Sequence, residues 1–255
     1  MNAATIESLA VGWHVECHNE VTSTNDLARE AGLSDHTTPL AIFADAQTAG
    51  RGQRSNRWIT PKGQDLMFSI LLKPEVAQEY WPRLTTMAAL AVCRAIEITL
   101  PLRPSIKWPN DIFIGPRKVC GLLAETCSSA SGPYLVLGIG LNVNTTAFAP
   151  ELRGIATSLL QELPATLREI DREVVAAAVL NELTEVMKLW TDGYHEVIGE
   201  VRPRSLLTGK SIRARVNGQE IHGRAADLNH EGHLVLQLAD GSSQVLSSAA
   251  EVRWD

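Results

Sequence analysis

The chain has 255 residues, with 45% hydrophobic and 20% charged residues, a formal net charge of −6 and a pI near 5.7. This composition is typical of a globular protein rather than a disordered one, and the acidic balance argues against nucleic acid as a partner. No apolar run reaches the ~20 residues that a membrane span needs, and no secretory signal opens the chain, so we expect a cytoplasmic protein with no membrane partner.

Cysteine and histidine usage predicts neither disulfide bonds nor a structural metal site. None of the four cysteines forms a Cys-x-x-Cys pair, so we interpret them as reduced, buried thiols. The seven histidines have no cysteine or carboxylate partners at ligand spacing, so we predict no structural metal site.

The first part of the chain alternates strands with one short helix. A Ser/Thr-rich start with an acidic first turn predicts a helix that Gly32 ends. The residues before it read as a short extension and an alternating strand, and two apolar runs after it read as buried strands. The expected segments are an extension over 1–10, strands over 13–18, 40–44 and 66–72, and a Gly/Arg loop over 47–64.

The middle of the chain predicts two longer helices around a strand hairpin. Helix 79–99 has an apolar stripe at helical spacing, and so does helix 166–191. The first stripe is Leu84, Met87, Ala88, Ala91, Ala95 and Ile98, and the second is Val175, Val179, Leu183, Val186 and Trp190. Strands are expected over 105–108, 111–114, 119–126 and 134–142, with a turn at 115–117.

The character of the sequence changes after Pro203. Short alternating segments cover 210–216, 219–227, 233–238 and 244–246, and the dipeptides at 217–218 and 240–241 are strong hairpin turns. This pattern predicts a small SH3-like β-barrel. The fold class is therefore α+β, with a mixed β-sheet catalytic domain over 1–202, helices packed on it, and a C-terminal barrel over 203–255.

A glycine-spaced, arginine-rich loop ends in Trp58. Gly50 and Gly52 let the backbone approach a ligand closely, and Arg51 and Arg54 supply donors suited to phosphate. Trp58 offers a flat face for a base. The alternative is a flexible surface loop, because a Gly-Arg-Gly sequence alone is weak evidence.

Lys107 ends a predicted strand and is followed by Trp108 and Pro109. Making an acyl-adenylate brings a carboxylate to an α-phosphate, so a fixed cation, Mg²⁺ or both should lie between the two anions. Lys107 is a candidate for that cation. The alternative is an ordinary lysine flanking a strand.

Two further segments carry small and polar residues. Ser23-Thr24-Asn25 places hydroxyls at a helix start, where one of them is explained by N-capping. Gly138 and Gly140 open room against a strand, and the Asn142 amide could read a base edge or simply occupy a turn. Phosphate-binding loops of the Walker type and Gly-x-Gly-x-x-Gly dinucleotide loops are absent from the sequence, so a nucleotide would be bound in another way.

Four segments in order resemble the biotin protein ligases. They are Ser23-Thr24-Asn25, Gln47 through Trp58, Lys107 through Asp111 with Arg117 through Glu125, and Gly138 through Asn142. The match spans about residues 13–145, and the long helix and C-terminal barrel fit the family's layout more loosely. Only a dozen residues precede the first predicted strand, so the chain resembles the monofunctional kind without an N-terminal DNA-binding domain.

The resemblance implies that biotin and ATP give biotinyl-5′-AMP and pyrophosphate. The biotinyl group then passes to a lysine of a biotin carrier domain, such as that of acetyl-CoA carboxylase. Mg²⁺ is expected to travel with ATP, and a homodimer is one possibility. By matched position, Lys107 and Arg51 would be catalytic. Biotin would contact Ser23, Thr24, Gln47, Gly50, Arg51, Lys107, Gly121, Gly138 and Gly140, and ATP would contact Arg51, Gly52, Arg54, Trp58, Lys107 and Asn142.

The chain departs from the family's usual Gly-Arg-Gly-Arg-x-Gly-Arg pattern at Gln53, Ser55 and Asn56. Two charges that would clasp the adenylate are missing, and a serine replaces a glycine. We therefore hypothesise that the closed loop is weaker and that the adenylate dissociates more readily.

Three other functions compete with this one. A lipoate or octanoate ligase shares the fold, but its pocket should be a long apolar tunnel without polar groups for a ureido ring. A biotin-sensing regulator would need a DNA- or partner-binding module. A binding protein could also use the small barrel alone.

Overall fold

The computed structural model describes residues 1–34, 36–52 and 58–254. A seven-stranded mixed sheet forms the larger part of the molecule, with strand order β1-β2-β3-β7-β6-β5-β4. β1 and β2 are parallel and the other neighbours are antiparallel. These strands are β1 (His14–His18), β2 (Leu40–Ala44), β3 (Leu66–Leu72), β4 (Ser105–Lys107), β5 (Asp111–Ile114), β6 (Arg117–Ser129) and β7 (Gly132–Leu141).

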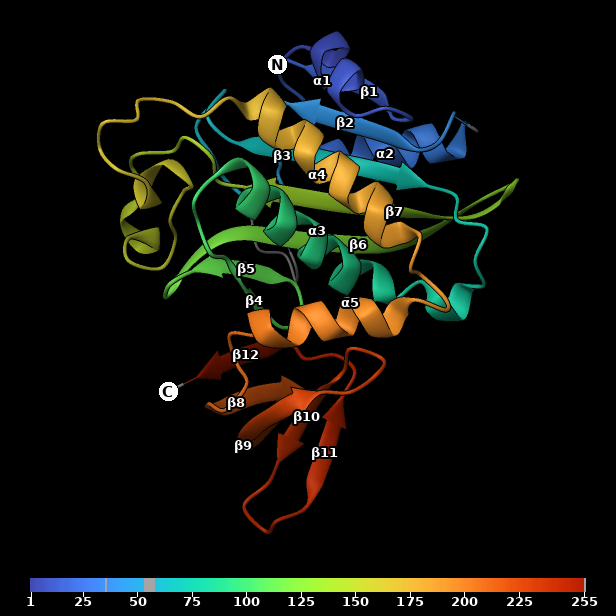
Figure 1. Ribbon diagram of the computed structural model, residues 1–255. Coiled ribbons are helices and arrows are strands. Elements are labelled where there is room, and N and C mark those ends of the chain that lie inside the picture. Colours follow the sequence, from blue (N-terminus) through green and yellow to red (C-terminus); the bar gives the residue numbers. More distant parts are fainter. Residues whose placement is uncertain (35, 53–57, 255) are drawn as a thin grey trace.

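Helices cover both faces of this sheet, which explains why β2 and β3 are buried along their whole length. Alternate side chains of a strand point to opposite faces. Leu40 and Ile42 pack toward α2 (Thr24–Leu33), whereas Ala41 and Phe43 pack into the larger core beneath α3 (Arg83–Thr99) and α4 (Arg172–Met187). Figure 1 shows α3 and α4 lying across that second face.

A second, antiparallel sheet follows α5 (Tyr194–Val201) and lies on the far side of that helix from the large sheet (Figure 1). Its strand order is β11-β10-β9-β8-β12. Its strands are β8 (Ser211–Val216), β9 (Gln219–Leu228), β10 (Leu234–Gln237), β11 (Ser243–Leu246) and β12 (Glu251–Trp254). Within the described chain no ladder joins the edge strands β11 and β12, so the barrel and the boundary at 202/203 stay predictions.

Most predicted elements of the sequence are present, and several assignments differ. The predicted helix 79–99 begins at Arg83, after a separate 3-10 turn over Gln78–Tyr80, and α2 continues through Gly32 to Leu33. Residues 1–10 are not an extension, because Ala3–Leu9 form α1, which buries Ile6 and packs on α4. The predicted helix 166–191 begins only at Arg172, where Asp171 caps it, and a break before Gly193 separates it from α5.

One predicted core residue is exposed, since Ile98 near the end of α3 is 68% accessible. The five residues of the second predicted stripe, which are four residues of α4 and Trp190 just beyond it, are all buried. All four cysteines are free thiols, two of them buried and two half-buried. Among the described residues no helix is long and apolar enough to cross a membrane.

A buried carboxylate fixes the chain where it leaves β7. Asp65 Oδ1 accepts hydrogen bonds from the backbone N–H groups of Val143, Asn144 and Thr145 at 2.7, 3.2 and 3.3 Å. Its Oδ2 accepts the Thr145 hydroxyl at 2.6 Å. Burial raises the pKa of Asp65, although these donors oppose the rise. The carboxylate therefore sets the path of residues 143–145, directly after Asn142.

Replacing Asp65 should test this anchor. Asp65→Ala leaves the buried N–H groups of Val143 and Thr145 without an acceptor, while Asn144 N–H keeps the Gln64 carbonyl, so we expect the free energy of unfolding to fall by about 4 kcal/mol. Asp65→Asn keeps one acceptor oxygen and should cost less than half as much. Urea denaturation measures both variants, and equal losses would contradict the role assigned to the acceptor.

Candidate active site

Two cavities meet on the α2 side of the large sheet. The smaller one is lined by the start of α2, by Gln47 and by glycines of β6 and β7. The larger one is a cleft of about 510 Å³ between the large sheet and β12, within the ~300–1,000 Å³ range of small-molecule sites. Both cavities share Gly52, Trp58, Asn110 and Lys118.

The start of α2 presents polar groups to the smaller cavity. Ser23 is the N-cap residue, but its side chain makes no capping hydrogen bond. The Thr24 backbone N–H and hydroxyl donate to Gln47 Oε1 at 2.7 and 3.1 Å. Gln47 reaches this position because residues 47–49 run beside Val21 and Thr22. The hydroxyls predicted to serve a ligand are therefore not used to cap the helix.

Ser69 of β3 was not predicted and joins the same group. Its Oγ lies 2.7 Å from Thr24 Oγ1 and 2.5 Å from Asn25 Oδ1. Ser69 is fully buried and is the single polar residue of an otherwise apolar strand. A lone buried polar residue in such a strand is the sequence feature that could have identified it.

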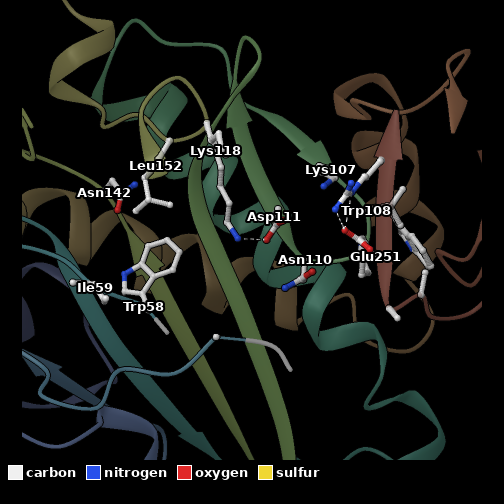
Figure 2. Close-up of a pocket in the computed structure, with 18 of the residues that line it drawn as sticks. Trp58, Ile59, Lys107, Trp108, Asn110, Asp111, Lys118, Asn142, Leu152 and Glu251 are labelled. Carbon is white, nitrogen blue, oxygen red and sulfur yellow. Dashed lines mark hydrogen bonds and ion pairs between the residues drawn. The ribbon is translucent and has the colours of Figure 1, made fainter. Parts of the chain in front are cut away.

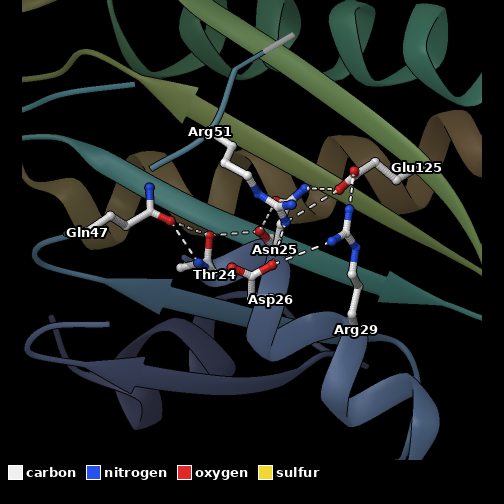
Figure 3. A network of polar contacts seen from close by, with 8 residues as sticks. Thr24, Asn25, Asp26, Arg29, Gln47, Arg51 and Glu125 are labelled. Carbon is white, nitrogen blue, oxygen red and sulfur yellow. Dashed lines mark hydrogen bonds and ion pairs between the residues drawn. The ribbon is translucent and has the colours of Figure 1, made fainter. Parts of the chain in front are cut away.

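Arg51 is held by acidic side chains at the rim of the smaller cavity. Its Nη2 donates to Asp26 Oδ1 at 2.6 Å and lies 3.9 Å from Glu125 Oε2 (Figure 3). Glu125 also accepts from Asn25 Nδ2 at 2.7 Å and pairs with Arg29. An anionic ligand would therefore have to compete with Asp26 for the Arg51 guanidinium.

Three glycines form a floor without side chains. Gly121 and Gly140 are direct cross-strand partners on β6 and β7. An added Cβ at Gly140 would overlap the Trp58 indole, and one at Gly138 would overlap the Asn25 amide. Gly50 is not part of this floor and packs against the Gln47 side chain and the backbone carbonyl of Trp58. The predicted glycines thus let Asn25 and Trp58 approach the sheet.

Trp58 lies where the two cavities meet. Its indole packs over Gly121 and Gly140, and the Lys118 ammonium lies 5.6 Å from the ring centroid. Within residues 1–34, 36–52 and 58–254, the Trp58 Nε1 is the one buried side-chain nitrogen or oxygen without a hydrogen-bond partner. The nitrogen lies against the sheet, 2.7 Å from the position of a Cβ added at Gly140.

Lys118 is the lysine that lines both cavities. It comes from β6, and its Nζ forms an ion pair with Asp111 Oδ1 at 2.6 Å (Figure 2). The sequence pattern included Lys118 in a matched segment but gave it no role. Only the pairing of β5 with β6, which sets Asp111 opposite Gly121, brings it to the junction.

Lys107 lies at the other end of the large cleft, beside β12. Its Nζ is 5.1 Å from the Trp254 ring centroid and 5.7 Å from that of Phe113. Burial lowers the pKa of Lys107, and Lys118 and Arg253 lower it further, while Asp111 and Glu251 oppose them. The structure therefore separates Lys107 from the smaller cavity and groups it with cations of the C-terminal sheet.

The remaining predicted residues divide into two groups. Asn142 lines the large cleft, and its Nδ2 donates to the Thr157 carbonyl at 2.9 Å, so it also fixes a neighbouring segment. Arg54, and the unusual Gln53, Ser55 and Asn56, lie outside the described residues.

The described residues do not fit a resident metal ion. They contain no group of three or more His, Cys, Asp or Glu side chains that could hold one. The two carboxylates that line the large cleft, Asp111 and Glu251, are already ion-paired with Lys118 and Arg253.

Comparison with known proteins decides the family. The family model described as "Biotin/lipoate A/B protein ligase family" matches residues 18–142. A second model, described as "Biotin protein ligase C terminal domain", matches residues 207–252. The bifunctional ligase/repressor BirA of Bacillus subtilis is 32% identical over 251 residues, which cover 97% of this chain and 76% of that protein. The chain belongs to the biotin protein ligase family.

Other biotin protein ligases match over similar lengths. The biotin–[acetyl-CoA-carboxylase] ligase of Mycobacterium tuberculosis is 31% identical, with 94% of this chain and 89% of that protein covered. The structure of the biotin protein ligase from Aquifex aeolicus in complex with biotin and ATP superposes with a TM-score of 0.83 at 28% identity, covering 94% and 99% of the two chains. The biotin ligase fold therefore extends over nearly the whole chain.

Removing the Lys107 charge should stabilise the fold. Because the folded-state pKa is lowered, the unfolded chain binds the proton more tightly, and the resulting cost is largest below the folded pKa. We expect Lys107→Met to have a higher free energy of unfolding than wild type at pH 7, and the difference to shrink as pH rises toward 10. Lys188→Met, at an exposed ion pair on the end of α4, is the control and should change stability by less than ~0.5 kcal/mol.

Proposed function

We propose that the protein makes biotinyl-5′-AMP from biotin and ATP and transfers the biotinyl group to one lysine of a biotin carrier domain, such as that of acetyl-CoA carboxylase. One observation carries this proposal: a small polar-ended cavity and a large cleft meet at Trp58 and Lys118. Two substrates held in these cavities would place their reacting groups beside one cation.

The smaller cavity suits a ureido ring. Such a ring carries one carbonyl acceptor and two N–H donors, and the cavity offers hydroxyl and amide groups from Ser23, Thr24, Asn25 and Gln47. Phe68, Leu122 and Ile139 also border this cavity, although their side chains belong to the larger core on the other face of the sheet. A linear lipoyl or octanoyl chain would leave the polar end unpaired, so these residues favour biotin.

The chemistry needs positive charge at the junction. A carboxylate oxygen of biotin attacks the α-phosphorus of ATP and pyrophosphate leaves. The acceptor amine then attacks the carbonyl carbon, and AMP leaves. Lys118 can offset the charge of both reacting anions, and Asp111 holds its ammonium in place. Lys107 and Arg253, at the β12 end of the cleft, are placed to bind the outer phosphates.

Several assignments from the matched motifs are part of this proposal. Arg51 would exchange Asp26 for the ligand, with Gly50 and Gly52 beside it, and Trp58 and Asn142 would hold the adenine. Arg54, which lies outside the described residues, stays a predicted ATP contact. Mg²⁺ would arrive with ATP, because the described residues offer no set of ligands for it.

Intact-mass spectrometry of a carrier domain tests the reaction. With biotin, ATP and Mg²⁺ we expect one added biotinyl group, and none when lipoate or octanoate replaces biotin. Lys118→Met should slow the reaction at least ~100-fold, as loss of a transition-state charge contact does, whereas Lys107→Met should mainly raise the ATP concentration required.

Lys188→Met is the control for both lysine variants, since Lys188 is exposed at the end of α4. If Lys107→Met abolished adenylate formation and Lys118→Met did not, Lys107 would be the bridging cation. Biotin binding without any modification of the carrier would instead support a biotin sensor.

Closing the glycine floor should weaken biotin binding. Gly138→Ala places a methyl group against Asn25, so we expect at least a tenfold rise in the biotin dissociation constant measured by calorimetry. Gly199→Ala in α5 is the matched control, because nothing lies within 4 Å of its added Cβ. Equal affinity of both variants would place biotin elsewhere.

Weak adenylate retention stays a prediction for the segment at Gln53, Ser55 and Asn56. Gln53→Arg should restore one charge and slow the release of biotinyl-5′-AMP, measured as its off-rate. An unchanged off-rate would reject the hypothesis.

A further inference from the structure

A tight turn of the C-terminal sheet, residues 229–233, is rigid through its own hydrogen bonds. Asn229 Oδ1 accepts from the backbone N–H groups of Glu231 and His233 at 3.0 and 2.9 Å. The Gly232 N–H donates to the Asn229 carbonyl at 3.0 Å, and Gly232 has φ +79°. A turn fixed in this way can hold a residue that contacts its tip in a defined position.

Arg83, the first residue of α3, clamps this turn to the large domain. Its guanidinium lies between the rings of Tyr80 and Tyr194, 4.5 and 4.4 Å from their centroids. Its Nη2 donates to both Glu231 oxygens at 3.2 and 3.1 Å, and its Nη1 donates to the Trp190 carbonyl at 3.0 Å. With only 12% of the Arg83 side chain exposed, this pair is better fixed than an ordinary surface ion pair.

The tip of the turn contacts the site motif. Trp108 Nε1 donates to the Gly232 carbonyl at 3.1 Å in a buried contact. Gly232 has no room for a side chain, because an added Cβ would lie 2.8 Å from the Tyr194 hydroxyl. Trp108 stands between Lys107 and Pro109, both of which line the large cleft.

Two more contacts join the C-terminal part of the chain to the same motif. The Leu206 N–H donates to the Ile106 carbonyl at 2.8 Å, which closes the outer edge of β4. Trp254 of β12 meets Phe113 edge-on at 5.6 Å and lies under the Lys107 ammonium. The segment from Lys107 to Asp111 is therefore held on one side by β5 and on the other by residues beyond 204.

We propose that the 229–233 turn, clamped by Arg83, positions the Lys107–Asp111 segment for the nucleotide. Arg83 and Glu231 are then positioning residues of adenylate formation, although neither lines the cleft. This inference rests on the proposed function. It predicts a larger effect on the nucleotide than on biotin, since Asn110 is the one residue of the segment that lines the smaller cavity. The other described residues of that cavity lie on α2, β3, β6 and β7, in Gln47–Gly52 and at Trp58, and none of them carries a contact described above to the turn.

Glu231→Gln tests the clamp in the full chain, and Gly232→Ala tests the tip. We expect each variant to raise the ATP concentration for half-maximal single-turnover adenylate formation by about tenfold. The biotin dissociation constant and the rate of transfer from preformed biotinyl-5′-AMP should stay within twofold of wild type. Glu231→Asp keeps the charge and should recover part of the loss, and Glu185→Gln, at the exposed pair on α4, is the matched control.

Two outcomes would overturn the proposal. An unchanged ATP dependence in a folded variant would show that the turn does not act on the nucleotide. A parallel loss of biotin and ATP binding would show that the contact only maintains the fold.

A readout independent of activity separates this proposal from the proposed function. Hydrogen exchange of the backbone N–H groups of residues 106–111 should be faster in Glu231→Gln than in Glu185→Gln. The same holds for the Trp108 indole N–H, whose signal is assigned by its loss in Trp108→Phe. If wild type makes no adenylate, the proposed function fails and exchange alone decides whether the turn orders the motif. Unchanged exchange rejects the positioning role in either case.

Discussion

The site depends on a patch of the large sheet that has no side chains on one face. Gly121 and Gly140 are cross-strand partners, and Gly138 follows on the same strand, opposite Ser69. Helix α2 and Trp58 can approach the strands only because these positions lack a Cβ. The same patch that weakens the packing of the sheet therefore creates the space that a ligand needs.

Charge is distributed to suit anionic substrates, although the whole chain carries a net charge of −6. The large cleft gathers Lys107, Lys118 and Arg253, against Asp111 and Glu251. A local cationic cleft in an acidic protein attracts phosphate and carboxylate groups. The acidic neighbours also hold Lys118 and Arg253 in place before any ligand arrives.

Local rules predicted much of the fold from the sequence. Strand alternation, helical stripes and the turns at Asn217-Gly218 and Asp240-Gly241 depend on neighbouring residues, so β2, β3 and the strands β8 to β11 lie within one residue of their expected bounds. α1 was missed because it is short and is stabilised by packing on α4 rather than by its own pattern. β12 and α5 were missed for a similar reason, since each is short and defined by its neighbours.

The candidate site was predictable in its residues more than in its geometry. The order of motifs placed Thr24, Gln47 and the glycines together, as the structure does. The sequence analysis assigned the bridging role to Lys107 and no role to Lys118, because the position of Lys118 beside Asp111 depends on the pairing of β5 with β6. The roles of Asp65 and of the Trp108–Gly232 contact depend on pairings between distant segments, and no local pattern indicates them. Ser69 differs, because it is the one polar residue of an apolar strand.

The Trp58 indole has an energetic consequence for the free protein. A buried donor without an acceptor costs roughly 1–3 kcal/mol, and within the described chain this N–H has no partner. Because protein atoms cover this nitrogen, an acceptor can reach it only if the indole turns away from Gly140. A movement of the Trp58 side chain that brought the nitrogen to an acceptor would recover that cost, so the packing described here favours such a movement.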